Sequence, residues 1–129
     1  MTIFSKIIAG QIPSYKVAEN DKFFAFLDIS PMAKGHTLVV PKIEIDKISD
    51  LPNEYLSEML IFAQPLMKAI EANFDCNRCG LIVMGLEVPH VHLHLVPINS
   101  ADDLNFTREK LKLSKEEFVE IQQKIIRVL

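Results

Sequence analysis

The order of hydrophobic patterns along the chain predicts an α+β fold with a mostly antiparallel sheet. Short β-prone runs come first, a long helical stretch follows at 52–73, and two further β-prone runs precede a final helical stretch. Runs of strands separated by one helix are typical of α+β proteins. With 129 residues, 49% hydrophobic and 24% charged, the chain has the size and composition of one globular domain.

The first third of the sequence predicts one short helix and three strands. A polar turn between the first two β-prone runs indicates a hairpin. A hydroxyl side chain can cap the helix, because it accepts hydrogen bonds from the free N–H groups of the first turn. The expected elements are a helix capped by Thr2 or Ser5 and ending at Ile8, and strands over 15–18, 23–27 and 36–40, the last ended by Pro41.

The long helix carries more apolar residues than one face can hold. Pro52 is suited to its first turn, where a missing N–H costs nothing, and Pro65 is expected to kink it. One sheet face cannot cover all of these side chains. The apolar strand expected over 81–84 would also be prone to aggregate if its edge were exposed. Both features predict a homodimer.

Two elements are expected near the carboxyl end. A strand over 90–97 alternates strictly, and Ser114 with Glu117 forms a capping box for a helix that runs to about Val128. Between the long helix and this region lies one C-x-x-C pair, Cys76 and Cys79. No second pair is present to complete a zinc site, so two reduced thiols in a loop are favoured over a redox pair.

Charge and hydropathy limit the partners. The formal net charge is −3, which argues against a nucleic acid polymer but not against a single nucleotide. The densest basic group, Lys110, Lys112 and Lys115, is interpreted as a solvated approach to the last helix. No apolar run is long enough to cross a bilayer and no secretory signal is visible, so no membrane partner and a cytoplasmic location are expected.

Three of the four histidines fall in one alternating stretch. Residues two apart in a strand point to the same face, so His90, His92 and His94 should line one surface. Such neighbours lie roughly 7 Å apart along the backbone, whereas zinc needs every ligand nitrogen at about 2.0–2.1 Å. A metal site and phosphate chemistry both remain open, and the spacing favours phosphate.

Imidazole suits the transfer of phosphoryl groups. Its neutral form is a nucleophile near pH 7, and its protonated form donates hydrogen bonds to phosphate oxygens or passes a proton to a leaving group. A row of imidazoles can divide these tasks among its members.

The residues 90–96, HVHLHLV, match the signature of the histidine triad family, in which three histidines alternate with apolar residues. The stretches 3–13, 26–31 and 34–42 also resemble the opening helix and central strands of that family. The resemblance covers roughly residues 1–98. It implies a five-stranded antiparallel sheet with one long and two shorter helices, paired in a homodimer. We therefore expect one domain over 1–129, with a core over 1–98 and a helical tail over 99–129.

The closest resemblance is to the nucleotide-binding hydrolases of the family, the Hint-like branch. These act on nucleoside monophosphates that carry an amine or acyl leaving group, with purine nucleoside phosphoramidates as typical substrates and no cofactor. The resemblance implies that His92 attacks the α-phosphorus and forms a nucleotidyl-histidine. It further implies that His90 orients the site, that His94 contacts the phosphate and leaving group, and that His36 completes the histidine cluster. Asp28 is expected to bind the ribose. The apolar sides of the base pocket are expected to be formed by Phe4, Ile7 and Phe26.

Two segments depart from the family pattern. Bacterial relatives often hold a structural zinc, and the positions of three of its ligands correspond here to Thr2, Ser5 and Glu44. We therefore expect no metal. The segment before the triad, 84–89, is shorter than in relatives and brings the carboxylate of Glu87 close to an anionic substrate.

The sequence thus predicts a nucleotide hydrolase or transferase that acts at the α-phosphate of phosphoramidate-type substrates. Hydrolysis of dinucleoside polyphosphates is an alternative within the enzymes. A nucleotide-binding regulatory module with weak activity, and a metal-dependent enzyme built on the histidines, are alternatives from other classes.

Overall fold

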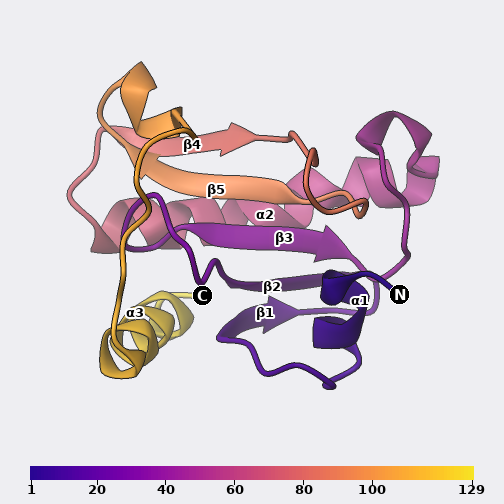
Figure 1. The fold of residues 1–129 in the computed structure, drawn as a ribbon, viewed down its shortest axis with the longest axis horizontal. Helices are drawn as coiled ribbons and strands as arrows, with labels where there is room; N and C mark the ends of the chain where they lie inside the picture. The colour runs from indigo at the N-terminus through magenta and orange to yellow at the C-terminus, as the bar shows by residue number, and fades with distance from the viewer.

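The computed structural model describes residues 1–129 and contains one five-stranded sheet in the order β1-β2-β3-β5-β4, with every neighbouring pair antiparallel (Figure 1). The α+β class and the antiparallel sheet are therefore confirmed. The elements are α1 (Ile3–Ile8), β1 (Lys16–Glu19), β2 (Phe23–Leu27), β3 (Thr37–Pro41), the short 3-10 helix η1 (Ile48–Asp50), α2 (Asn53–Asn73), β4 (Arg78–Ile82), β5 (Leu93–Ile98), the 3-10 helix η2 (Ala101–Leu104) and α3 (Lys115–Arg127).

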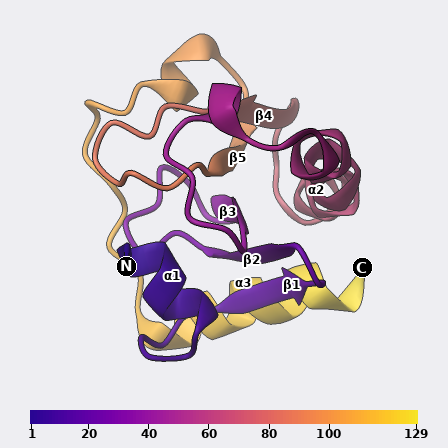
Figure 2. The same ribbon diagram turned by 90° about the vertical axis from the view of Figure 1, so that its right-hand side faces the viewer.

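The sheet separates two hydrophobic clusters. Seen along the sheet, α2 lies on one side, α1 lies on the other, and α3 runs past the β1 end (Figure 2). The larger cluster, of 17 buried residues, includes side chains from α2, α3 and the sheet. The smaller cluster, of six, packs α1 against β2 and β3. All five residues of β2 are buried because its alternate side chains enter one cluster or the other.

Local hydrogen bonds explain the helix starts. The hydroxyl of Thr2 accepts from the N–H of Ser5 at 3.1 Å and caps α1. Ser114 and Glu117 form the expected capping box at the start of α3. Pro52 lies one residue before α2, whose interior contains Pro65. The two hydroxyl caps and the long helix are confirmed, while the kink expected at Pro65 stays a prediction.

The bounds expected for three strands, β1, β3 and β4, were wrong. The strand expected over 15–18 runs from Lys16 to Glu19. The strand expected over 81–84 runs instead from Arg78 to Ile82, so it includes Cys79, which was expected in a loop. Pairing with β5 extends it toward the amino end, since Arg78 pairs with Ile98. β3 runs over 37–41 and includes Pro41, whose missing N–H is tolerated at the end of a strand.

The alternating histidine stretch is also less regular than expected. β5 begins only at Leu93, so His90 and His92 precede the strand. The N–H of Val91 donates to the carbonyl of Ile45 at 2.7 Å, and the N–H of His90 donates to Val88. Neither bond belongs to the ladder of hydrogen bonds between neighbouring strands, so β5 begins only after these residues.

None of the helices combines the length and the apolar character that a membrane-spanning helix needs.

Candidate active site

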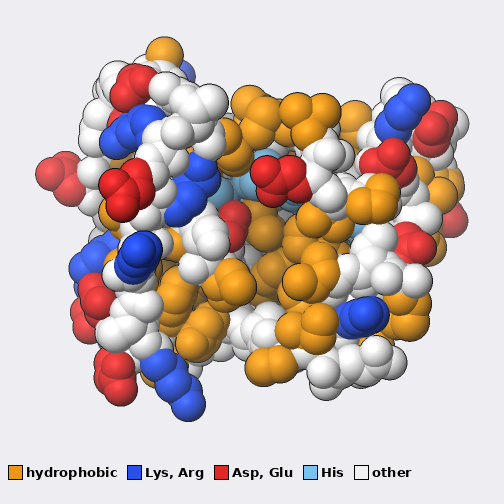
Figure 3. Space-filling view, viewed as in Figure 1, with side chains coloured by type: hydrophobic (Ala, Val, Ile, Leu, Met, Phe, Trp, Pro, Cys, Tyr) orange, Lys and Arg blue, Asp and Glu red, His pale blue; other side chains and the backbone are white.

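Side chains from both ends of the sequence meet in a hollow on the α1 side of the sheet. Figure 3 shows histidine atoms in the middle of this face, bordered by hydrophobic, acidic and basic side chains. The rings of His92 and His94 lie 4.8 Å apart, and those of His36 and His94 lie 5.2 Å apart. The structure thus brings the predicted triad and His36 into one cluster.

The sheet register accounts for this meeting. β3 and β5 are neighbours, with Leu38 opposite His94 and Thr37 opposite Leu95. His36 immediately precedes β3 and therefore lies near His94, 58 residues away in sequence. Val91, Leu93 and Leu95 belong to the larger core cluster.

The backbone determines the proton positions on His36 and His94. The N–H of Met32 donates to Nδ1 of His36 at 3.0 Å, so the neutral ring carries its proton on Nε2. That proton points to Nδ1 of His94, 3.0 Å away. Nδ1 of His94 must then accept, which leaves the proton of His94 on Nε2.

His92 has the opposite tautomer. Its Nδ1 lies 2.7 Å from the carbonyl oxygen of His90, which can only accept, so Nδ1 carries the proton. The lone pair of Nε2 is therefore free. Every buried side-chain nitrogen and oxygen has a partner, so this unpartnered Nε2 is open to the hollow.

His90 has both ring nitrogens engaged. Nε2 donates to the carbonyl of Pro41 at 2.9 Å, and Nδ1 lies 2.8 Å from the hydroxyl of Thr2. Since a carbonyl only accepts, neutral His90 carries its proton on Nε2 and accepts from Thr2 on Nδ1. This ring is fully buried and offers no free nitrogen to a ligand.

Burial keeps three of the histidines neutral. Desolvation by the surrounding protein lowers the pKa of His36 to about 3 and that of His94 to about 4. The same cause lowers the pKa of His92. At neutral pH, His92 therefore holds the unprotonated form that a nucleophile needs.

Asp28 stands next to the cluster. Its Oδ1 accepts from the N–H of Ser30 at 2.9 Å, as a turn residue would, while its Oδ2 lies 3.6 Å from Nε2 of His36. Burial raises the pKa of this carboxyl, and exposed Glu87 contributes a smaller effect in the same direction. Because only Oδ1 accepts a hydrogen bond from the backbone, Oδ2 can accept one from a bound hydroxyl.

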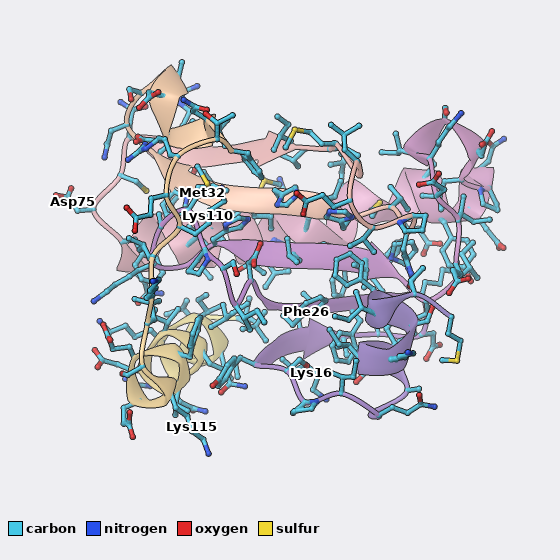
Figure 4. The ribbon with its side chains drawn as sticks, in the orientation of Figure 1. Lys16, Phe26, Met32, Asp75, Lys110 and Lys115 are labelled. Atoms are coloured by element: carbon cyan, nitrogen blue, oxygen red, sulfur yellow. The ribbon has the colours of Figure 1, made fainter.

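The three apolar residues expected around a base lie together. Phe4, Ile7 and Phe26 are buried in the smaller cluster, with Phe26 on β2 beside α1 in the view of Figure 4. The ring of Phe4 meets that of Phe26 edge-on at 5.7 Å and that of His92 at 4.9 Å. An apolar surface therefore adjoins His92.

Two residues of the segment between β5 and α3 were missed. The ring of Phe106 packs edge-on against His94 at 4.7 Å and approaches His36 at 6.1 Å. The ammonium of Lys110 donates to the carbonyls of Phe106 and Arg108 and is close enough to affect Asp28 and His36 electrostatically.

The expectation that Lys110 lies on a solvated approach was therefore wrong: it is half-buried beside the site, at the end of the sheet where Figure 4 also places Met32. The N–H of Leu111 donates to the carbonyl of Pro31 and ties this segment to the loop that carries Asp28 and His36. The one available signal for this contact, a lone aromatic residue in the mostly polar stretch 99–112, was not used to predict it.

Two places in the chain could be considered for a metal ion, the group Asp28, His36 and His94 and the positions of Thr2 and Ser5, and the residues fit a metal at neither. Asp28, His36 and His94 lie close enough together to share an ion, but the Met32 amide keeps the proton of His36 on the nitrogen that would have to bind it. Thr2 and Ser5 supply hydroxyls, which are not ligands that structural zinc sites use.

The two cysteines stand apart from any such site. Both are free thiols, and burial raises the pKa of Cys79 to about 12, which keeps it protonated. A protonated thiol is neither a nucleophile nor a metal ligand. The interpretation as two reduced thiols therefore fits the structure.

This chain is similar to known proteins in sequence and in fold. Residues 9–101 match the HIT domain family. Adenosine 5'-monophosphoramidase HNT1 of Saccharomyces cerevisiae is 41% identical over 96 residues, which cover 74% of this chain and 61% of the yeast protein.

Two crystal structures have closely similar folds. A Hit-like protein involved in cell-cycle regulation from Bartonella henselae has a TM-score of 0.85 and 31% identity, covering 99% of this chain and 96% of its own. A zinc-bound histidine triad protein from Mycobacterium smegmatis has a TM-score of 0.80 and 26% identity, covering 97% and 93%. Together with the clustered histidines, the match over 9–101 shows that this chain belongs to the HIT domain family, the histidine triad proteins.

Proposed function

We propose that this chain is a nucleotide hydrolase or transferase that cleaves adenosine 5'-phosphoramidate-type substrates at the α-phosphate through a nucleotidyl-His92 intermediate. The observation that carries the proposal is the tautomer pattern. Of the four histidines, only His92 presents an unprotonated Nε2 to the hollow. The name of the yeast relative, adenosine 5'-monophosphoramidase, supports the same substrate class.

The reaction follows from these positions in two steps. In the first, the Nε2 lone pair of His92 forms a bond to the α-phosphorus while the phosphorus–nitrogen bond to the amine breaks. The proton on Nδ1 remains hydrogen-bonded to the His90 carbonyl, which stabilises the positive charge that the ring acquires. In the second step, water attacks phosphorus and His92 leaves. The leaving amine takes its proton from Nε2–H of His94 in the first step, and the attacking water returns that proton to His94 in the second.

The neighbouring side chains have separate tasks in this proposal. His94 directs Nε2–H into the hollow, where it donates to a phosphate oxygen or to the leaving group. His36 holds His94 in that tautomer. Asp28 accepts from the ribose hydroxyls, and the apolar wall of Phe4, Ile7 and Phe26 contacts the base.

Trapping the intermediate tests the proposal. The protein is mixed with adenosine 5'-phosphoramidate, quenched in alkali, and examined by mass spectrometry for an added adenylyl group. Wild type should show the adduct transiently. His92→Asn should still bind adenosine monophosphate but form no adduct, while the matched variant His94→Asn should form it slowly. Near-normal turnover by His92→Asn would refute the proposal.

The same samples distinguish the alternatives. Preferential turnover of a dinucleoside polyphosphate would move the function to that class of hydrolase. Nucleotide binding with no adduct and no turnover in wild type would indicate a regulatory module. Loss of activity on treatment with a chelator would indicate a metal-dependent enzyme.

We also propose a homodimer. β4 lies at one edge of the sheet, where it exposes Leu81. α2 exposes Leu56, Leu60 and Ile61, the last 70% accessible. A second copy that covers this edge and helix would bury them and supply a two-fold pair of sites.

Sedimentation tests the dimer. Wild type should sediment as a dimer at micromolar concentration. Ile61→Glu should shift it toward monomer, and the matched change Ile126→Glu, on α3, should not. A monomeric wild type would contradict the proposal.

We further propose that the protein is cytoplasmic, because its two free cysteines suit a reducing compartment.

A further inference from the structure

A cluster of three polar side chains supports the first triad histidine from the amino end of α1. The hydroxyl of Thr2 lies 2.8 Å from Nδ1 of His90 and 3.3 Å from the hydroxyl of Ser5. Ser5 in turn donates to Oε1 of Glu44 at 2.8 Å, and the same oxygen accepts from the N–H of Thr2 at 2.7 Å. We call Thr2, Ser5 and Glu44 the Thr2 cluster.

The hydroxyl of Thr2 has one donor and two possible acceptors as neighbours, and Nδ1 of His90, at 2.8 Å, is a nearer acceptor than the Ser5 hydroxyl, at 3.3 Å. The N–H of Ser5 donates to it at 3.1 Å, so its oxygen accepts at the start of the helix. Its proton is then free for Nδ1 of His90, which must accept because Nε2 already donates to Pro41. One hydroxyl therefore caps α1 and completes the hydrogen bonding of a fully buried imidazole.

His90 is connected to the nucleophile through its own backbone. Its carbonyl is the acceptor for Nδ1–H of His92, and this bond selects the tautomer that frees Nε2. The contacts of the His90 ring with Pro41 and Thr2 hold residue 90 in place, and with it the carbonyl that His92 uses. Phe4, two residues after Thr2, contacts the rings of both His90 and His92, so α1 and the triad are packed together at this point.

We propose that Thr2 is a positioning residue, and that the Thr2 cluster supports His90 by hydrogen bonds at the place where a zinc ion would require cysteine and histidine ligands. The inference rests on the proposed function of His92 as nucleophile. Thr2 contributes most, because it contacts the buried ring directly. Glu44 lies at the surface, where water screens its charge, and contributes little.

Four variants test this role. Thr2→Val keeps the branched shape but removes the hydroxyl, and Thr2→Ser restores it. Ser114→Ala removes a hydroxyl cap of the same kind from α3, far from the triad, and controls for the loss of a helix cap. Glu44→Gln tests the surface end of the cluster. Each is assayed for kcat and KM with adenosine 5'-phosphoramidate and for the ¹⁵N shifts of the histidine rings.

Thr2→Val should lower kcat roughly 3- to 10-fold, the effect of losing one hydrogen bond between neutral groups, with KM within about twofold of wild type. Thr2→Ser, Ser114→Ala and Glu44→Gln should stay within about twofold in kcat. The ¹⁵N spectrum of wild type should show His90 protonated on Nε2 alone, with a hydrogen-bonded Nδ1 whose shift moves in Thr2→Val.

Three results would overturn the inference: equal kcat for Thr2→Val and Thr2→Ser, an equal loss in Ser114→Ala, or a wild-type His90 protonated on Nδ1. Failure of the proposed function is separate from these. It would appear as wild type without turnover, and the ¹⁵N spectra would still test the contact between Thr2 and His90.

Discussion

Acid should destabilise this protein well before its carboxylates protonate. His36 and His94 are buried and neutral, with pKa values lowered to about 3 and about 4 by desolvation. In the unfolded chain both return to about 6.5. Below pH 6.5 the unfolded state therefore binds protons that the folded state does not, and the free energy of unfolding falls as the pH falls.

The magnitude follows from the unfolded pKa alone, provided that the folded values stay below the pH of the experiment. At pH 5, each such histidine costs about 2 kcal/mol relative to pH 7.5, so the pair costs about 4 kcal/mol. A domain of this size has roughly 5–15 kcal/mol of stability in total. The loss would therefore be a large share of it.

Urea denaturation at pH 7.5, 6.0 and 5.0 measures this loss directly. His36→Asn is the informative variant, because the amide oxygen of asparagine can accept from the Met32 N–H in place of Nδ1 but does not titrate. It should reduce the loss between pH 7.5 and pH 5.0 by about 2 kcal/mol, the contribution of His36, whatever its effect on stability at pH 7.5. A free energy that stays constant from pH 7.5 to 5.0, or an unchanged slope in His36→Asn, would refute the reasoning.

Three further predictions concern the site. Because burial lowers the pKa of His92, the midpoint of the acid fall in kcat/KM should lie below pH 6.5 as His92 protonates; a midpoint at or above 6.5 would contradict this. Phe106→Ala should admit water beside the third triad histidine, raise its pKa in NMR titration and lower kcat/KM about 2- to 12-fold, whereas an unchanged titration would exclude the contact. The combined variant Thr2→Cys, Ser5→Cys and Glu44→His should bind one zinc per chain by elemental analysis, and wild type none, because the polar atoms there lie only 2.8–3.3 Å apart.

Much of the fold was predictable because its signals are local. The hairpin over 15–27, the hydroxyl caps and the long helix after Pro52 each depend on residues a few positions apart. Strand ends were less predictable, because partners far away in sequence determine them. β4 extends back to Arg78 only because Ile98 lies opposite, and β5 starts late because Val91 donates to Ile45 instead.

The residues that form the site were only partly predictable, because some of them come together through contacts between distant segments of the chain. Alternation placed the triad on one surface, and the register of β3 with β5 then brought His36 to it. Phe106 and Lys110 lie in a segment without regular pattern. A backbone hydrogen bond from Leu111 to Pro31 joins this segment to the loop before His36, and Phe106 packs against His94. No periodicity in the sequence reports such a contact.

The distinction between the histidines lies in the backbone rather than in the residue type. An amide N–H faces Nδ1 of His36, so this ring donates from Nε2, and a carbonyl faces Nδ1 of His92, so this ring keeps a free lone pair on Nε2. A second carbonyl, from Pro41, holds His90 in the same tautomer as His36. Four chemically identical side chains thus take different roles because neighbouring peptide groups present either a donor or an acceptor.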